Sequence, residues 1–150
     1  MDKTCNLMSS NSRFAVATHI LALLANSEPN EYVTSDFIAA SVNTSPVVIR
    51  RLLQTLTEGG FVFSKEGAQG GSVLAVPAEQ ITLLAVYRTV GENELFTLHH
   101  NPPNPNCIVG RSIKGILQDV GNTAQNAMEQ ELAKVTIAQL LERVLSRSSA

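Results

Sequence analysis

A cysteine at the end of a polar loop is the residue best suited to chemistry in this chain of 150 residues. Cys107 follows a run of prolines and asparagines that begins just after His99 and His100, and it precedes Arg111 by four positions. A periodic apolar segment begins directly after it, which predicts that Cys107 lies at a helix start. Backbone N–H groups and the helix dipole favour a thiolate at that position.

Three interpretations of Cys107 remain open. It is an inert and buried cysteine, or a redox or electrophile sensor, or part of a metal or small-molecule site with His99 and His100. No Cys-x-x-Cys or His-x-x-x-His spacing supports zinc. The second cysteine, Cys5, lies in the N-terminal segment and is at best an occasional disulfide partner.

Several classes of protein do not fit the sequence. It contains no nucleophile elbow, P-loop or Rossmann glycine pattern, so we expect no enzyme. No apolar run approaches the roughly 18 residues that a membrane span needs, and the first ten residues lack the features of a secretory signal. With 44% hydrophobic residues and a net charge of -2, the sequence predicts a cytoplasmic protein of one domain without a membrane partner.

Two adjacent arginines are the second feature that can carry function. Arg50 and Arg51 are the only charged residues from Phe37 to Thr57. They predict a locally positive patch within a mildly acidic protein, although the overall charge alone does not favour a nucleic-acid partner.

Three expected helices position these arginines. The first runs over residues 12–26 with Ser12 as its cap, and the second is a short apolar pattern of Phe37, Ile38 and Val42 behind Thr34 or Ser35. The third begins near Pro46, whose missing N–H costs nothing in the first turn of a helix.

The third helix has a clear inner and outer face. Its apolar residues Ile49, Leu52, Leu53 and Leu56 follow helical spacing and form the buried side. The outer side then holds Val47, Arg51 and Gln54, with Arg50 beside them. The glycines 59 and 60 supply a left-handed stop. A short helix followed by a turn and such a helix is typical of a helix-turn-helix.

A β-hairpin is expected directly after the third helix. The β-prone runs 61–63 and 72–76 flank a glycine-rich tip at 64–71. A helix pair followed by a hairpin forms a winged helix, in which glycines let the main chain approach DNA closely.

The second half is expected to hold the sensor and the dimer contacts. A helix over 77–90 ends at Gly91, and a last short helix begins at Thr136. Between them, a long helix over 109–134 carries a stripe that suits packing against a second copy, made of Ile113, Leu117, Val120, Ala124, Ala127 and Met128. We therefore predict a DNA-binding region at 1–76 and an effector loop with dimerisation helices at 77–150, within one compact subunit.

These pieces together resemble the Rrf-two (Rrf2) family of bacterial winged-helix transcription regulators, and within it most closely the YwnA-type subgroup. The matching segments are 12–17 (SRFAVA), 41–51 (SVNTSPVVIRR), the wing glycines Gly67, Gly70 and Gly71, 81–84 (ITLL) with Tyr87 and Arg88, and 104–107 (NPNC) with Gly110 and Arg111. They span most of the chain in the order of the family. One departure is Ala75, at a wing position where the family often has arginine.

The resemblance implies a mainly α fold with a small β-hairpin wing and a long C-terminal dimerisation helix. It implies a homodimer on double-stranded DNA, with a palindromic operator read by two recognition helices. The DNA-contacting residues would be Ser12, Arg13, Thr44, Ser45, Pro46, Val47, Arg50, Arg51, Gln54, Lys65, Gln69, Gly70 and Ser72. The effector region would comprise Cys107, His99, His100 and Arg111.

Iron–sulfur members of the family hold their cluster with three closely spaced cysteines, and this sequence has one cysteine in that region. We therefore expect no cofactor. The function predicted is a homodimeric repressor whose operator binding responds to a redox or small-molecule signal at Cys107. The alternative is a dimeric protein-interaction or ligand-binding module of the same fold that does not bind DNA.

Overall fold

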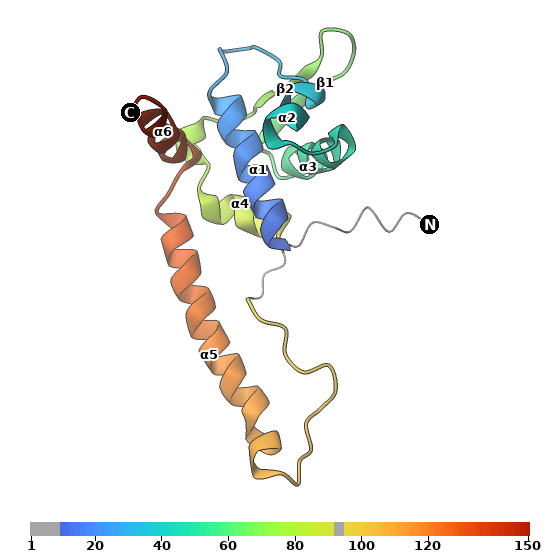
Figure 1. Ribbon diagram of the computed structural model, residues 1–150, viewed down its shortest axis with the longest axis vertical. Coiled ribbons are helices and arrows are strands. Elements are labelled where there is room, and N and C mark those ends of the chain that lie inside the picture. The colour runs from blue at the N-terminus through green and yellow to red at the C-terminus, as the bar shows by residue number, and fades with distance from the viewer. Residues whose placement is uncertain (1–9, 92–94) are drawn as a thin grey trace.

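The computed structural model describes residues 10–91 and 95–150, which form helices and one two-stranded hairpin (Figure 1). In chain order the elements are α1 (Ser10–Ala25), α2 (Ser35–Val42), α3 (Pro46–Glu58), β1 (Val62–Lys65), β2 (Gly71–Leu74), the 3-10 helix η2 (Ala78–Gln80), α4 (Leu83–Val90), α5 (Ile108–Ala133) and α6 (Ile137–Ser148). This is the mainly α fold with a hairpin wing that the sequence predicts.

Local capping signals set the boundaries of α2 and α3. The Thr34 hydroxyl accepts a hydrogen bond from the backbone N–H of Phe37, and the Ser45 hydroxyl accepts one from Val48. Between the two helices Asn43 adopts a left-handed conformation with φ of 63°, which asparagine tolerates better than most residues. The expected helix-turn-helix is confirmed, but Phe37 is 60% exposed and does not belong to the buried face of α2.

Two expected helix ends are corrected by the structure. Helix α1 begins at Ser10, so Ser12 lies within its first turn and is not its N-cap. At the end of α3, only Gly60 takes the left-handed conformation, with φ of 83°, whereas Gly59 stays helical with φ of -75°.

The hairpin is antiparallel and pairs Val62 with Leu74 and Lys65 with Gly71. Its strands are shifted by one or two residues from the expected runs, and its tip is shorter, spanning 66–70. The helix-turn-helix followed by this hairpin is a winged helix.

The expected helix over 77–90 is interrupted, which is the main error of the sequence prediction. Ile81 is extended and buried between η2 and α4. Its carbonyl accepts a hydrogen bond from Ile137, and Leu83 donates to the carbonyl of Val135. Residues 81–83 therefore pair with the start of α6 through an isolated β-bridge between Thr82 and Thr136, and this non-local pairing overrides helical periodicity.

One hydrophobic core lies around α1, and it continues across residue 76. The residues Ile81, Val86, Val90 and Ile137 come from the second half of the chain and are buried with those of the winged helix. The core members from the first half are Ala17, Ile20, Leu21, Leu24, Val33, Ile38, Ala39, Ile49, Leu52, Leu53, Leu56 and Val62. Helices α4 and α6 thus cover α1 and belong to the same packed body.

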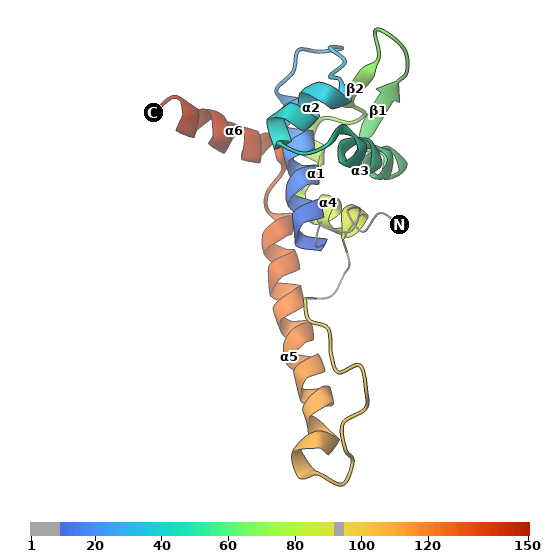
Figure 2. The same cartoon turned by 45° about the vertical axis from the view of Figure 1, so that its right-hand side comes forward.

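The segment after residue 95 runs outward from this body, and helix α5 begins at the far end of that segment and returns alongside it, so that the two form an arm (Figure 2). The 26 residues of α5 span about 39 Å at 1.5 Å per residue. None of them is buried in the single chain. Across residues 10–91 and 95–150, no helix combines the length and the apolar character that crossing a lipid bilayer requires.

Candidate nucleic-acid interface

Helix α3 presents a polar outer face because its inner face is fixed by the core. Ile49, Leu52, Leu53 and Leu56 are buried, as the spacing predicts. Arg51 and Gln54 are exposed, and Val47 is 50% exposed. At 100° per residue these three side chains point away from the core.

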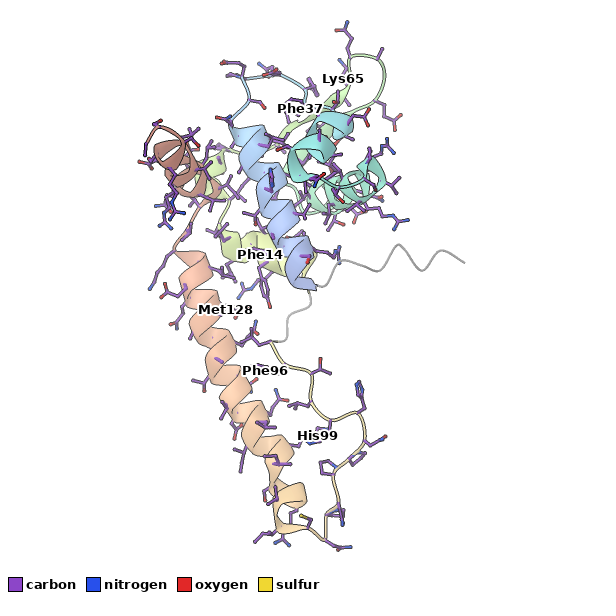
Figure 3. All side chains as sticks on the ribbon, viewed as in Figure 1. Phe14, Phe37, Lys65, Phe96, His99 and Met128 are labelled. Atoms are coloured by element: carbon purple, nitrogen blue, oxygen red, sulfur yellow. The ribbon has the colours of Figure 1, made fainter. Side chains whose placement is uncertain are left out.

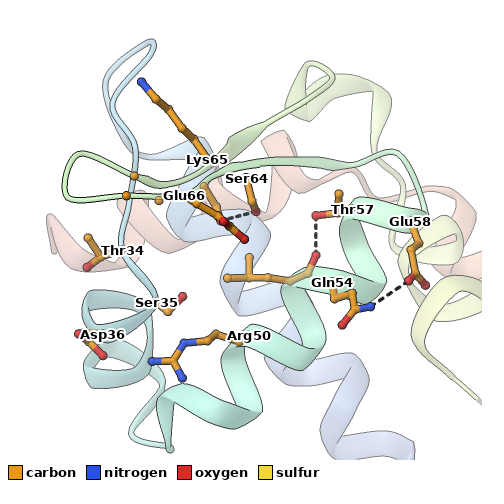
Figure 4. A pocket seen from close by; sticks show the side chains of 15 residues that line it. Thr34, Ser35, Asp36, Arg50, Gln54, Thr57, Glu58, Ser64, Lys65 and Glu66 are labelled. Carbon is orange, nitrogen blue, oxygen red and sulfur yellow. Dashed lines mark hydrogen bonds between the residues drawn. The ribbon is translucent and has the colours of Figure 1, made fainter.

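A groove of about 600 Å³ lies between α3 and the hairpin. Arg50 and Gln54 line it from α3, and Lys65 and Gly70 line it from the hairpin (Figure 4). The groove also holds three acids, Asp36, Glu58 and Glu66. The positive charge is therefore confined to a few side chains, and their individual positions matter more than the mean charge of the surface.

The amide of Gln54 is held by its neighbour on the helix. Gln54 Nε2 donates a hydrogen bond to Glu58 Oε1, 3.3 Å away and one turn further along α3 (Figure 4). This contact uses one of the two N–H donors of the amide, so the second N–H and the carbonyl oxygen of Gln54 remain for a ligand.

The wing is tied to the loop before α2 by the main chain. Val33 and Ser72 exchange two backbone hydrogen bonds of 3.0 and 2.8 Å. Gly71 has φ of 150°, and a Cβ on it would lie 2.7 Å from the Val33 carbonyl oxygen, so only glycine permits this close approach. The sequence gives no signal for Val33, because the bridge joins residues far apart in the chain.

The predicted DNA-contacting residues fall into distinct places. Ser45 and Pro46 form the start of α3, where Thr44 is half-buried, and Gln69 is exposed at the hairpin tip. The predicted contact by Ser72 is wrong for its side chain, which is 2% exposed and whose hydroxyl pairs with that of Ser64 at 2.9 Å. Ser12 and Arg13 lie in the first turn of α1, at the end of that helix far from the wing (Figure 1).

The second candidate region is the start of α5. Cys107 is the N-cap residue of this helix, and its carbonyl accepts the first helical hydrogen bond, from Arg111 at 3.0 Å. The side chain of Cys107 is exposed. The expectation that Cys107 is buried is therefore wrong for the single chain.

The backbone around Cys107 favours its ionised form. The N–H of Gly110, and to a lesser degree that of Val109, lowers the pKa of the thiol below its ordinary value. The neutral sulfur closes no capping hydrogen bond, but a thiolate is a much stronger acceptor than a thiol, so the same N–H groups stabilise the ion. Gly110 also allows the loop at Asn104 to lie close against the start of α5, since a Cβ on Gly110 would lie 2.5 Å from the carbonyl oxygen of Asn104.

His99 and His100 lie elsewhere on the arm. Both are exposed and line an apolar hollow of about 610 Å³ with Phe96, Leu117 and Val120 (Figure 3 labels Phe96 and His99). Cys107 does not line this hollow. Leu117 is ten positions after Cys107, which is about 15 Å of helix. Among the residues that the structure describes, no three His, Cys, Asp or Glu side chains gather as metal ligands, and Cys5 lies outside those residues.

The lowered pKa of Cys107 gives a pH dependence that can be measured directly. In a Cys5→Ser background, we expect the rate of iodoacetamide alkylation to rise with a midpoint at lower pH in the folded protein than in urea. The pKa of Cys107 is lower in the folded protein than in the unfolded chain. The ionised thiol therefore stabilises the folded protein at pH values above the unfolded pKa, and this contribution is lost as the pH falls through the folded pKa. Equal midpoints in the two states would show that the helix start does not activate this thiol.

Comparisons with known proteins agree on one family. The family model of Rrf2, described as an iron-dependent transcriptional regulator, matches residues 10–143. YwnA of Bacillus subtilis strain 168, described as a candidate HTH-type transcriptional regulator, is 42% identical over 135 residues, which cover 89% of this chain and 98% of YwnA.

Solved structures share the fold. The crystal structure of a candidate DNA-binding protein aligns with a TM-score of 0.68 and 37% identity, covering 87% of this chain and 99% of that one. CymR, the global cysteine regulator of B. subtilis, aligns with a TM-score of 0.68 and 20% identity, covering 91% of this chain and 98% of its own.

Proposed function

Because the chain belongs to the Rrf2 family of transcriptional regulators, we propose that it is a homodimeric repressor that binds a palindromic operator in the cytoplasm. The observation that carries this proposal is the outer face of α3, where Arg51 and Gln54 are exposed, on a helix that is followed directly by a hairpin wing. Such a helix fits the major groove, while the wing reaches the DNA backbone.

The exposed apolar face of α5 supports the homodimer. Ile108, Val109, Ile116, Leu117 and Val120 are between 42% and 73% exposed in the single chain. Two such arms packed together would bury these side chains and place two recognition helices on one duplex. Symmetry then doubles every DNA contact.

The donor set of this chain does not fit an iron–sulfur cluster. Such clusters are held mainly by cysteine thiolates, usually four of them, whereas this chain has two cysteines in all. The one that the structure describes, Cys107, is exposed. We therefore propose that regulation does not run through a cluster, although the family model is described as iron-dependent.

Regulation is proposed to act at Cys107 itself. A peroxide can oxidise an exposed thiol whose pKa is lowered by helix N–H groups to a sulfenic acid, as the O–O bond of the peroxide breaks. The sulfenic acid can then condense with a second thiol to a disulfide, with loss of water. Oxidation at the start of α5 would shift the equilibrium between a wing spacing that matches the operator and one that does not. Arg111, whose backbone N–H donates to the carbonyl of Cys107, would shape the surroundings of this sensor, whereas His99 and His100 line a separate hollow on the arm.

Selection of bound fragments from a genomic DNA library tests both parts of the proposal. The reduced protein should enrich a palindrome, and mild oxidation of the same protein should abolish the enrichment. A Cys107→Ser protein should enrich the same palindrome in both conditions, which attributes the response to this thiol. If the parent protein enriches the same palindrome before and after oxidation, the proposed thiol sensor is wrong and the proposed repressor stands.

No enrichment in either state would favour the protein-interaction module without DNA binding. The three acids in the groove beside α3 favour this protein-interaction module, because they repel DNA phosphates. Salt separates the two functions, because DNA affinity falls steeply with added salt as counterions are released, and a mainly apolar protein interface does not respond in this way.

A further inference from the structure

Tyr32 makes a contact with the wing that the expected DNA-binding set does not include. It lies in the loop between α1 and α2, and the ammonium nitrogen of Lys65 is 5.5 Å from the centroid of its ring. Figure 4 shows Lys65 leaving the hairpin on the side of that loop and away from Arg50. The geometry is that of a cation–π contact.

Lys65 is the cation on which the electrostatics of the wing depend. Within residues 62–74 the charged residues are Lys65 and Glu66 only. In the part of the chain that the structure describes, no carboxylate lies within salt-bridge distance of Lys65. Glu31, the residue before Tyr32, uses its carboxylate to accept a hydrogen bond from the backbone N–H of Glu28. The positive charge of Lys65 is therefore not neutralised by a neighbouring acid.

The backbone joins the loop that carries Tyr32 to the hairpin that carries Lys65. Val33, next to Tyr32, exchanges two hydrogen bonds with Ser72. Lys65 stands opposite Gly71 in the hairpin register. Tyr32 therefore lies next to one residue of this bridge, Val33, and Lys65 is paired with Gly71, the neighbour of the other residue, Ser72. The side chain of Tyr32 is half-buried. The bridge thus fixes the main chain next to the ring and next to the strand that carries Lys65.

We propose that Tyr32 is a positioning residue of the DNA interface: its ring orients the Lys65 ammonium so that the wing presents an ordered cation to a DNA phosphate. The inference rests on the proposed DNA binding. A lysine has a flexible four-carbon stem and loses much rotamer freedom when it binds a phosphate. The ring imposes part of that loss before binding and covers one side of the ammonium, so the N–H donors on its other side remain for phosphate oxygens.

The affinity for a short random-sequence duplex, measured by fluorescence anisotropy over a salt series, tests the proposal. Lys65→Ala should weaken binding by about 3- to 10-fold and reduce the salt slope by about one per subunit. Tyr32→Leu, which keeps an apolar side chain but no ring, should weaken binding by about 2- to 5-fold. Tyr32→Phe is the matched control and should bind like the parent.

A double variant separates positioning from a structural role. Tyr32→Leu added to Lys65→Ala should weaken binding no further, because the ring acts through the lysine. Tyr32→Leu should also remove the upfield ring-current shift of the Lys65 side-chain protons in NMR spectra, and Tyr32→Phe should keep it. If Tyr32 only filled space in the loop, Tyr32→Leu would weaken binding by the same factor with and without Lys65.

The outcomes separate the proposed DNA binding from the positioning role of Tyr32. If the parent binds no duplex at low salt, the proposed function is wrong, and the role of Tyr32 in DNA binding falls with it. If the parent binds DNA and Tyr32→Leu matches it, or weakens binding equally with and without Lys65, only the positioning role is wrong. Should Tyr32→Leu fail to fold, an unshifted Lys65 side chain in the parent spectrum would overturn the proposal without that variant.

Discussion

Replacement of Arg51 by alanine is expected to weaken operator binding by at least roughly 30-fold and to leave a folded protein of unchanged oligomeric state. Arg51 is exposed on the outer face of α3, opposite the buried leucines, where alanine is a good helix residue. An arginine that binds guanine with two hydrogen bonds contributes about 1 to 3 kcal/mol of discrimination. A dimer loses two such contacts, which is about 2 to 6 kcal/mol, or at least roughly 30-fold in affinity.

Two further variants make the Arg51 result specific. Arg143→Ala removes the same charge from an exposed position on α6 and should leave DNA binding unchanged. Arg50 lines the groove beside the wing, so Arg50→Ala should weaken operator and random DNA alike and reduce the salt slope. If Arg51→Ala binds the operator selected by the parent as tightly as the parent does, Arg51 does not belong to the recognition surface.

The parts of the interface that rest on local signals were predictable from the sequence. Thr34 and Ser45 are capping residues, Pro46 suits a first turn, and the buried leucines of α3 follow helical spacing. Each of these signals lies within a few residues of the feature that it specifies. The position of Cys107 at the start of α5 was predictable for the same reason, because a polar loop gives way there to a periodic segment.

The rest depends on pairings between segments far apart in the chain. Ile81 is extended because its carbonyl pairs with Ile137, more than fifty positions later, and no pattern near Ile81 indicates this. The contacts of Val33 with Ser72 and of Tyr32 with Lys65 have the same origin. Tertiary context decides such positions against local propensity.

A carboxylate placed on the exposed face of α5 is expected to convert the protein into a folded monomer with little operator affinity. Ile116 and Val120 are each 58% exposed and lie one turn apart on that helix. In a dimer that buries this face, Ile116→Glu would place an unpaired charge in the interface twice. Burial of such a charge costs about 3 to 5 kcal/mol, so the dimer should weaken by more than about 100-fold.

Sedimentation velocity measures the oligomeric state, and a matched variant isolates the face of the helix. Gln118→Glu adds the same group two positions away, about 200° around α5 from Ile116, and should remain a dimer. The core lies around α1 and contains no α5 residue, so Ile116→Glu should unfold at nearly the parent's temperature in the winged-helix body. A monomer holds one recognition helix and loses the gain from two linked contacts. If Ile116→Glu sediments as a dimer and binds the operator, this face is not where two copies meet.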